Sequence, residues 1–253
     1  MRAQRRATRL AGIEIDALIL DLDGVITRTA RVHAAAWKRL FDDYLRQRAT
    51  RDGTPFSPFD AGREYAEHVD GKPRYDGVRD FLASRGIELP LGTPDDPPEA
   101  ETVAGLGNRK NILFVEALES HGAEVFEGSV RLIRSMRAAG LGLAVVSASR
   151  NCQLVLRRTG LLDLFDVVVD GLYAAEHDLP GKPAPDTFLC AARSLGVPPE
   201  RAAVVEDALA GVAAGRAGGF GLVIGVDRGA GRDRLSKAGA DIVVGDLAEV
   251  SIG

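Results

Sequence analysis

The feature that most constrains the fold is an apolar run that ends abruptly in two aspartates and a glycine. Residues 17–20 are apolar throughout, and Asp21, Asp23 and Gly24 follow them. Such a run is typical of a strand buried in a parallel sheet. Residues two apart in a strand point to the same side, so the two carboxylates repel each other unless a cation lies between them. We therefore predict a metal-assisted site at the carboxyl end of this strand, with one aspartate free to act as nucleophile or base. The alternative is a turn that Asp23 and Gly24 simply close.

The second half of the chain alternates apolar, strand-like runs with amphipathic, helix-like segments. Strict alternation predicts a parallel sheet with right-handed crossovers and helices on both faces. We expect a doubly wound α/β fold. Together with the first strand at 17–20, the expected strands are 141–146, 165–169, 202–205, 221–226 and 241–244, and the expected helices are 129–139, 152–158, 184–195, 209–217 and 232–238.

Residues 29–122 lack this alternation. Helical spacing of apolar residues recurs at 31–45, 78–84 and 108–120, and loops rich in proline, glycine and charge separate these segments. We expect a small helical domain inserted after the first strand. The α/β core then comprises residues 1–28 and 123–253, and the inserted domain comprises residues 29–122.

Polar residues also follow two of the later strands. Ser147 and the backbone N–H groups after it suit a phosphoryl oxygen, although a serine there also suits the cap of the next helix. Lys182, fixed between a glycine and a proline, is placed to offset the charge of carboxylates and a phosphate. A solvated surface lysine is the alternative.

Two further acids, Glu206 and Asp207, close the strand at 202–205. The carboxyl ends of parallel strands face the same crevice, so these acids are expected near Asp21 and Asp23. Hard oxygen ligands of this kind suit Mg²⁺, which also takes a substrate phosphate. All four acids are candidate ligands of a magnesium ion.

These clusters, taken in chain order, resemble the four motifs of the haloacid dehalogenase superfamily of phosphotransferases. Asp21–Val25 is similar to the first motif, Ser147 to the second, Lys182 to the third and Glu206–Asp207 to the fourth. The resemblance covers essentially the whole chain and implies a Rossmann-like core with a helical cap. It also implies that Asp21 attacks phosphorus to form an aspartyl-phosphate, that Asp23 gives and takes the proton, and that Mg²⁺ neutralises the site.

A closer resemblance is to the β-phosphoglucomutase-like group, carried by residues 29–37, 147–151 and 181–186. It implies that Ser147, Ala148 and Asn151 hold a phosphate. Arg150 stands where a lysine is more usual in that group, and it keeps the charge.

The same resemblance implies roles for residues of the inserted domain. Thr29 and His33 are expected near the general acid/base and the hinge of the cap. Arg74 is the best match to an arginine that grips the non-transferring phosphate, and Lys110 to a lysine that contacts the sugar. The inserted domain departs from the group at 49–65 and 91–100, where it carries extra segments.

The expected activity is that of a phosphohexomutase converting β-glucose 1-phosphate to glucose 6-phosphate through the 1,6-bisphosphate. A hydrolase of sugar phosphates or other small phosphate esters uses the same residues and is the alternative. A non-catalytic binding domain is a third possibility, against which the intact Asp21, Asp23, Lys182 and Asp207 argue.

Composition limits the partners. The 253 residues carry a net charge of −4, which gives no electrostatic reason to expect nucleic acid or an anionic membrane as a partner. No apolar run approaches the length of a membrane span. Two cysteines favour a reducing cytoplasm, and the basic residues 1–6 are expected to form a solvated tail. We expect a monomer or weak dimer acting on a small phosphorylated sugar.

Overall fold

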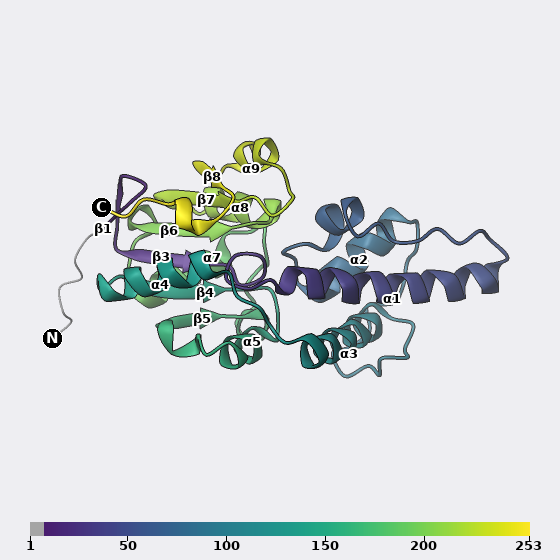
Figure 1. The fold of residues 1–253 in the computed structure, drawn as a ribbon. Helices are drawn as coiled ribbons and strands as arrows, with labels where there is room; N and C mark the ends of the chain where they lie inside the picture. The colour runs from purple at the N-terminus through teal and green to yellow at the C-terminus, as the bar shows by residue number, and fades with distance from the viewer. Residues whose placement is uncertain (1–7) are drawn as a thin grey trace. The chain divides into compact units, whose positions relative to one another are not determined.

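The structure is a computed structural model in which residues 8–253 are described, so the expected tail at 1–6 lies outside the described residues. The chain divides into two compact units (Figure 1). Unit 1 comprises the described residues up to Arg28 together with Ala123–Gly253, and unit 2 comprises Thr29–Gly122. Each unit is described by itself below.

Unit 1 is built on a six-stranded parallel sheet with the strand order β5-β4-β3-β6-β7-β8. The doubly wound α/β fold predicted from the alternation is therefore confirmed. The strands are β3 (Ala17–Leu20), β4 (Gly142–Val146), β5 (Val167–Val169), β6 (Ala202–Glu206), β7 (Leu222–Val226) and β8 (Ile242–Val244).

The burial of each strand follows its place in this order. All residues of the four central strands are buried, whereas the edge strands β5 and β8 are half-buried for most of their length. Ala17 and Ile19 of β3 belong to the same core cluster as residues of helices α7 and α8. Leu18 and Leu20 point to the opposite face because side chains alternate along a strand. A strand buried on both faces must be apolar throughout, which explains the run at 17–20.

Strand register places the ends of three strands level. Leu20 pairs with Val145 of β4 on one side and with Val205 of β6 on the other. The chain runs outward from β3 through β4 to β5 and then returns to β6 on the other side of β3. The strand order therefore reverses at β3, and in open α/β sheets ligands bind at such a switch point.

Helices connect the strands of unit 1, and three of them, α5, α8 and α9, have the predicted bounds. The short helix α6 was not predicted from the sequence. Asp170 caps it, accepting hydrogen bonds from the backbone N–H groups of Leu172 and Tyr173. The helices are α4 (Glu127–Ala138), α5 (Cys152–Arg158), α6 (Gly171–Glu176), α7 (Asp186–Leu195), α8 (Leu209–Ala217) and α9 (Arg232–Ala238), with 3₁₀ turns at Leu162–Leu164, Pro199–Arg201 and Leu247–Glu249.

A β-hairpin that the sequence analysis did not predict precedes the sheet. β1 (Thr8–Leu10) pairs antiparallel with β2 (Ile13–Ile15). The two turn residues, Ala11 and Gly12, both have positive φ (48° and 83°), as in the turns that match the twist of a hairpin. The C-terminal residue Gly253 exchanges backbone hydrogen bonds with Arg9 of this hairpin.

Unit 2 is helical, and none of its described residues forms a strand. It contains α1 (Thr29–Asp52), a π-helical turn (Tyr65–Val69), α2 (Arg74–Ser84) and α3 (Val103–His121). Phe41, Phe59 and Phe81 pack against one another in its core with tilted or edge-to-face rings. The first helix extends beyond the predicted end at residue 45 because no glycine or proline interrupts it before Gly53, where φ is +65°.

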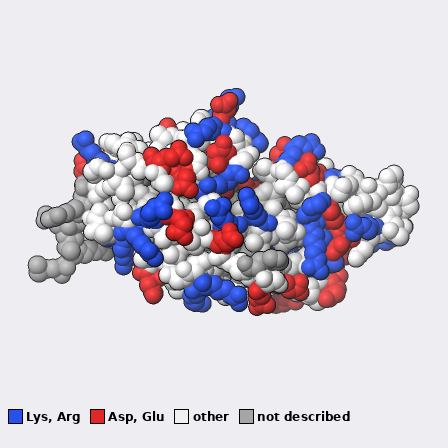
Figure 2. All heavy atoms as spheres, viewed as in Figure 1, with Lys and Arg blue, Asp and Glu red and all other residues white. Residues whose placement is uncertain are grey.

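Two observations bear on the expected partners. Among residues 8–253, no helix has the length and apolar character needed to cross a bilayer. On the face shown in Figure 2, basic and acidic residues are interspersed rather than gathered by sign.

Candidate active site

The predicted nucleophile lies at the carboxyl end of β3, at the switch point of the sheet. Asp21 is 6% exposed, and its backbone N–H donates to the carbonyl oxygen of Val205 at 3.0 Å. Lys182 is also buried, and its ammonium group donates to Asp21 Oδ1 at 2.5 Å. Lys182 is therefore fixed on a carboxylate, and the alternative of a solvated lysine is excluded.

Glu206 holds Lys182 from the neighbouring strand. Its Oε1 forms an ion pair with the Lys182 ammonium, and its Oε2 accepts hydrogen bonds from the backbone N–H groups of Asp207 and Ala208 at 3.1 and 3.2 Å. A Cβ at Gly211 would overlap this carboxylate. Only glycine at position 211 therefore allows the start of α8 to pack against Glu206. Glu206 therefore fixes Lys182 beside Asp21.

The burial of these charges shifts their pKa values. Desolvation raises the pKa of Asp21 well above its ordinary value, and although the Lys182 charge opposes this, the Glu206 and Asp23 charges add to it. Burial by itself lowers the pKa of Lys182, but the Asp21 and Glu206 carboxylates raise it above its ordinary value. One buried cation is thus shared by several carboxylates, and the cluster has an excess of negative charge.

This cluster fits a divalent cation. Asp21, Glu206 and Asp207 each offer a carboxylate oxygen within 4.8 Å of the others. An all-oxygen, anionic donor set is the kind that Mg²⁺ prefers. A divalent cation would also offset the excess of carboxylates over ammonium groups in this cluster. The residues present therefore fit a magnesium ion.

Asp23 lies on the turn after β3 and is linked to the end of the neighbouring strand β4. Ser147 Oγ donates to Asp23 Oδ2 at 3.3 Å and accepts from the backbone N–H of Ser149 at 3.1 Å. Helix α5 begins only at Cys152, with Asn151 at its cap position. Ser147 is too early in the chain to cap that helix, which excludes the alternative raised from the sequence.

Gly24 allows this turn to approach the end of β6. Its φ is +92°, and a Cβ at this position would overlap the carboxylate of Asp207. Its N–H donates to the carbonyl oxygen of Thr27 at 2.7 Å. Both the backbone conformation and the close approach require glycine.

The loop after Ser147 carries the predicted phosphate-binding residues Ala148, Arg150 and Asn151, all of them half-buried. The backbone N–H of Asn151 donates to Ser149 Oγ at 3.2 Å. The loop packs against the start of α6, where a Cβ at Gly171 would overlap the carbonyl oxygen of Ala148 and contact the Arg150 side chain.

Two of the residues predicted in unit 2 are brought together. Lys110 is buried, and its Nζ lies 2.5 Å from His33 Nδ1. The His33 ring stacks on Phe114 with 4.0 Å between centroids. The Lys110 ammonium also lies over the rings of Trp37 and Phe114, at 4.9 and 5.0 Å.

The other two lie at helix starts in unit 2. Thr29 is the first residue of α1 and Arg74 the first of α2. The Arg74 guanidinium donates to the carbonyl oxygen of Gly107 at 3.4 Å, three residues ahead of Lys110 on α3. Arg74 is therefore near Lys110 within unit 2.

A loop is expected at 74–77 from the sequence. This expectation is wrong, because α2 begins at Arg74.

Comparison with known proteins decides the family. Residues 15–219 match the haloacid dehalogenase-like hydrolase family. The chain is 53% identical over 248 residues to a β-phosphoglucomutase of Mycobacterium tuberculosis, covering 96% of this chain and 95% of that one. It belongs to the haloacid dehalogenase superfamily. The resemblance found in the sequence, including the β-phosphoglucomutase-like group, is confirmed, and the chain is an enzyme of the phosphohexomutase or phosphatase type.

Solved structures of the superfamily support the same assignment. A β-phosphoglucomutase from Clostridium difficile matches with a TM-score of 0.73 and 27% identity, covering 93% of this chain and 92% of that one. CbbY from Rhodobacter sphaeroides, solved with xylulose-(1,5)bisphosphate, matches with a TM-score of 0.70 and 27% identity, covering 93% and 96%.

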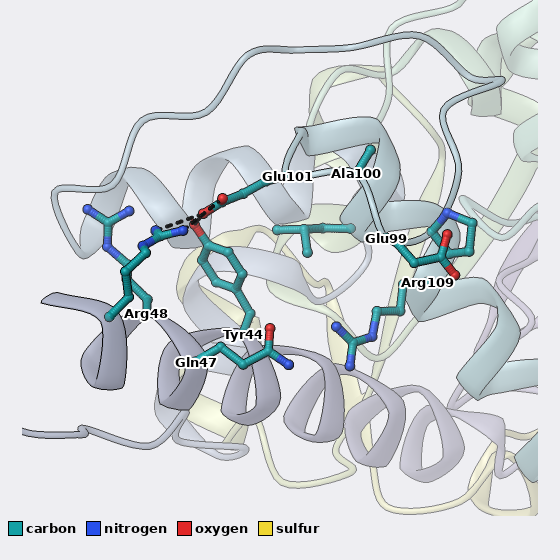
Figure 3. Close-up of a pocket in the computed structure, with 10 residues that line it drawn as sticks. Tyr44, Gln47, Arg48, Glu99, Ala100, Glu101 and Arg109 are labelled. Atoms are coloured by element: carbon teal, nitrogen blue, oxygen red, sulfur yellow. Dashed lines mark hydrogen bonds and ion pairs between the residues drawn. The ribbon is translucent and has the colours of Figure 1, made fainter.

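Unit 2 also contains a pocket of about 240 Å³ between α1 and the segment before α3 (Figure 3). Its arginines are already paired with carboxylates: Arg51 with Glu101 through two hydrogen bonds of 2.9 Å, Arg48 with Asp52 at 3.3 Å and Arg109 with Asp43 at 3.5 Å. Because these charges cancel locally, the pocket lacks the excess positive charge of a phosphate site.

Arg228 is a residue of unit 1 that the sequence analysis missed. It follows β7, and its Nε donates to the carbonyl oxygen of Gly24 at 2.9 Å. Its Nη1 donates to the carbonyl oxygen of Gly245 at 2.8 Å. A lone arginine after a strand carries no pattern that reveals a contact with a turn 204 residues earlier.

Proposed function

We propose that this enzyme is a β-phosphoglucomutase that transfers a phosphoryl group through an aspartyl-phosphate at Asp21. The observation that carries the proposal is the buried Asp21 carboxylate, held through Oδ1 by Lys182 and lying within the acidic cluster at the switch point. The similarity to the Mycobacterium tuberculosis β-phosphoglucomutase over nearly the full length of both chains supports the substrate class.

The first half-reaction forms a bond between an Asp21 oxygen and the phosphorus and breaks the bond from phosphorus to the sugar oxygen. Lys182 occupies Oδ1, so Oδ2 is the oxygen that attacks. The leaving sugar oxygen takes a proton from Asp23, which in the return step accepts a proton from the attacking sugar hydroxyl. The donor in the first half-reaction is the 1,6-bisphosphate, which gives its C1 phosphoryl group to Asp21 and leaves as glucose 6-phosphate. In the return step the 6-hydroxyl of β-glucose 1-phosphate takes the phosphoryl group from Asp21, which breaks the bond from phosphorus to Asp21 and forms the 1,6-bisphosphate again.

Asp21, Asp23, Glu206 and Asp207 are the proposed ligands of Mg²⁺. When bound, the ion neutralises the charge of the phosphoryl oxygens and of the surrounding carboxylates. Glu206 offers a carboxylate oxygen within 4.8 Å of those of Asp21 and Asp207. Its second proposed part is to hold Lys182.

The loop after β4 is proposed to hold the phosphoryl oxygens. Ser147 offers its hydroxyl, Ala148 its backbone N–H, and Arg150 and Asn151 their side chains. Charge-assisted donors of this kind compensate the negative charge of a phosphate.

Unit 2 is proposed to act as the cap. His33 and Lys110, which already contact each other, are assigned to the sugar hydroxyls, Arg74 to the non-transferring phosphate, and Thr29 to the hinge and acid/base region. A mutase must keep water from the aspartyl-phosphate while admitting a sugar hydroxyl, which a closing cap achieves.

A coupled assay from β-glucose 1-phosphate to glucose 6-phosphate, primed with bisphosphate, tests this proposal. We expect turnover that requires Mg²⁺ and is lost in Asp21→Asn. Rapid release of inorganic phosphate without glucose 6-phosphate would instead favour the alternative, a sugar-phosphate phosphatase. The likeness to CbbY, solved with a sugar bisphosphate, makes sugar bisphosphates the first substrates to screen in that case. Cytoplasmic location and a monomer or weak dimer stay predictions.

A further inference from the structure

Arg228 joins three separate parts of unit 1. Its side chain reaches the Gly24 carbonyl in the turn that carries Asp23, and the Gly245 carbonyl after β8. Its guanidinium lies over the Phe126 ring at 3.5 Å from the centroid. Among the described residues Nη2 has no hydrogen-bond partner, whereas Nε and Nη1 each donate to a main-chain carbonyl.

The turn that Arg228 holds is the one that sets the acidic cluster. Gly24 has the left-handed φ of +92°, and its Cα approaches the Asp207 carboxylate so closely that no Cβ fits. A displacement of the Gly24 peptide therefore moves Asp23 and alters its distance from Asp207. Such a displacement is costly, because an error of about 1 Å in catalytic geometry can lower a rate by a factor of about 100.

Phe126 connects Arg228 to both chain segments that lead to unit 2. The backbone N–H of Phe126 donates to the Ile26 carbonyl at 2.9 Å, and that of Arg28 donates to the Glu124 carbonyl at 2.9 Å. The Arg28 guanidinium also lies over the Phe126 ring, at 4.3 Å from its centroid. One aromatic ring thus contacts an arginine of the first linker and the arginine that holds the active-site turn.

We propose that Arg228 is a positioning residue that fixes the Asp23–Gly24 turn beside Asp207 and, through Phe126, ties this turn to the paired linkers. It acts on the reaction only through the turn. The inference rests on the proposed function in that it assigns the catalytic groups to this turn, but it does not depend on which phosphate ester is the substrate.

The first test compares Arg228→Gln with Arg216→Gln. Arg216 is a matched control because it also donates to a main-chain carbonyl, that of Gly239 at 3.0 Å, and pairs with Asp241, away from the turn. We expect kcat to fall about 30- to 100-fold in Arg228→Gln, with KM changed less than about threefold and a partial return of kcat in Arg228→Lys. Phe126→Leu is expected to give a smaller loss in kcat.

Hydrogen exchange provides a measurement that does not need turnover. The N–H groups of Gly24, Ile26 and Thr27 are bonded within the turn. We expect them to exchange at least about tenfold faster in Arg228→Gln, while the amides of β7 keep their protection. A general loss of stability would instead speed the exchange of the turn amides and of the β7 amides equally.

The outcomes separate the two proposals. If the enzyme hydrolyses a phosphate ester but makes no glucose 6-phosphate, the mutase proposal fails and the Arg228 comparison is made on that hydrolysis. If kcat and turn exchange in Arg228→Gln match those in Arg216→Gln, the positioning role is wrong whatever the substrate.

Discussion

The two units handle charge in different ways. In unit 1 the central ion pairs lie at the ends of buried strands, and the Lys182 and Asp21 side chains are 2% and 9% exposed. In unit 2 the pairs around the pocket lie at the surface, and the Arg51 and Glu101 side chains are 55% and 43% exposed. Water screens the second kind of pair and not the first. The buried pair of Lys182 and Asp21 therefore lies in the unit in which phosphoryl transfer is proposed.

Removal of one charge from each kind of pair gives the largest expected contrast. Lys182→Met leaves the Asp21 and Glu206 carboxylates buried without their cation, which should cost about 3–5 kcal/mol of unfolding free energy in urea. Arg51→Met should leave the urea midpoint nearly unchanged. Adding Glu206→Gln to Lys182→Met should recover part of the loss. Equal losses in the two single variants would show that burial does not distinguish the units.

A pair of glycines in unit 1 sharpens the comparison within the site. Gly24 and Gly12 both have positive φ, but nothing lies within 4 Å of a Cβ at Gly12, whereas one at Gly24 meets the Asp207 carboxylate. Each alanine variant pays a strain of about 1–2 kcal/mol, but only Gly24→Ala should also lose about 100-fold in turnover. Steady-state kinetics on both variants checks this. Similar activities would mean that the turn tolerates movement.

Neighbouring cations on α3 of unit 2 test the proposed sugar contact. Lys110 lies beside His33, while Arg109 pairs with Asp43 at the pocket. Lys110→Met should raise KM for the sugar phosphate by about tenfold, the loss expected for one hydrogen bond to a charged group. Arg109→Met should leave KM unchanged. If both variants alter KM equally, Lys110 has no special place among the cations of unit 2.

The smallest expected effect is a pH dependence of stability in unit 2. Burial alone raises the pKa of Glu64, but the Arg85 guanidinium and the backbone N–H of Asp60 lower it below its ordinary value. A lowered pKa contributes stability above the unfolded pKa of 4.5 that is lost as pH falls through the folded pKa. Glu64→Gln should therefore remove on the order of 1 kcal/mol of unfolding free energy at pH 7. It should also flatten the acid limb, which is the fall in unfolding free energy toward low pH.

Urea unfolding between pH 3 and pH 7 measures this limb. Glu116→Gln is the matched control, because its pair with Arg39 spans 3.7 Å and is exposed on both sides. If the acid limb persists in Glu64→Gln, other carboxylates cause it and the prediction for Glu64 is wrong.

Helix and strand positions in the sheet were predictable because they rest on local pattern. The bounds of α5, α8 and α9 follow from apolar spacing within each segment. The hairpin β1–β2 was missed because its strands have three residues each, too few to show a period. The loop expected at 74–77 is wrong because the glycine and the charged residues there, which favour a turn, lie in the first turn of α2.

The sequence by itself determined that carboxylates stand at the ends of two parallel strands, since a buried strand must be apolar until it reaches the edge of the sheet. It also determined the family. Only the tertiary structure decided which charges meet: Lys182 on Asp21 across 161 residues, Glu206 on Lys182, and Arg228 on Gly24 across 204. Those contacts depend on strand register and on the packing of distant loops, which no local pattern of residues encodes.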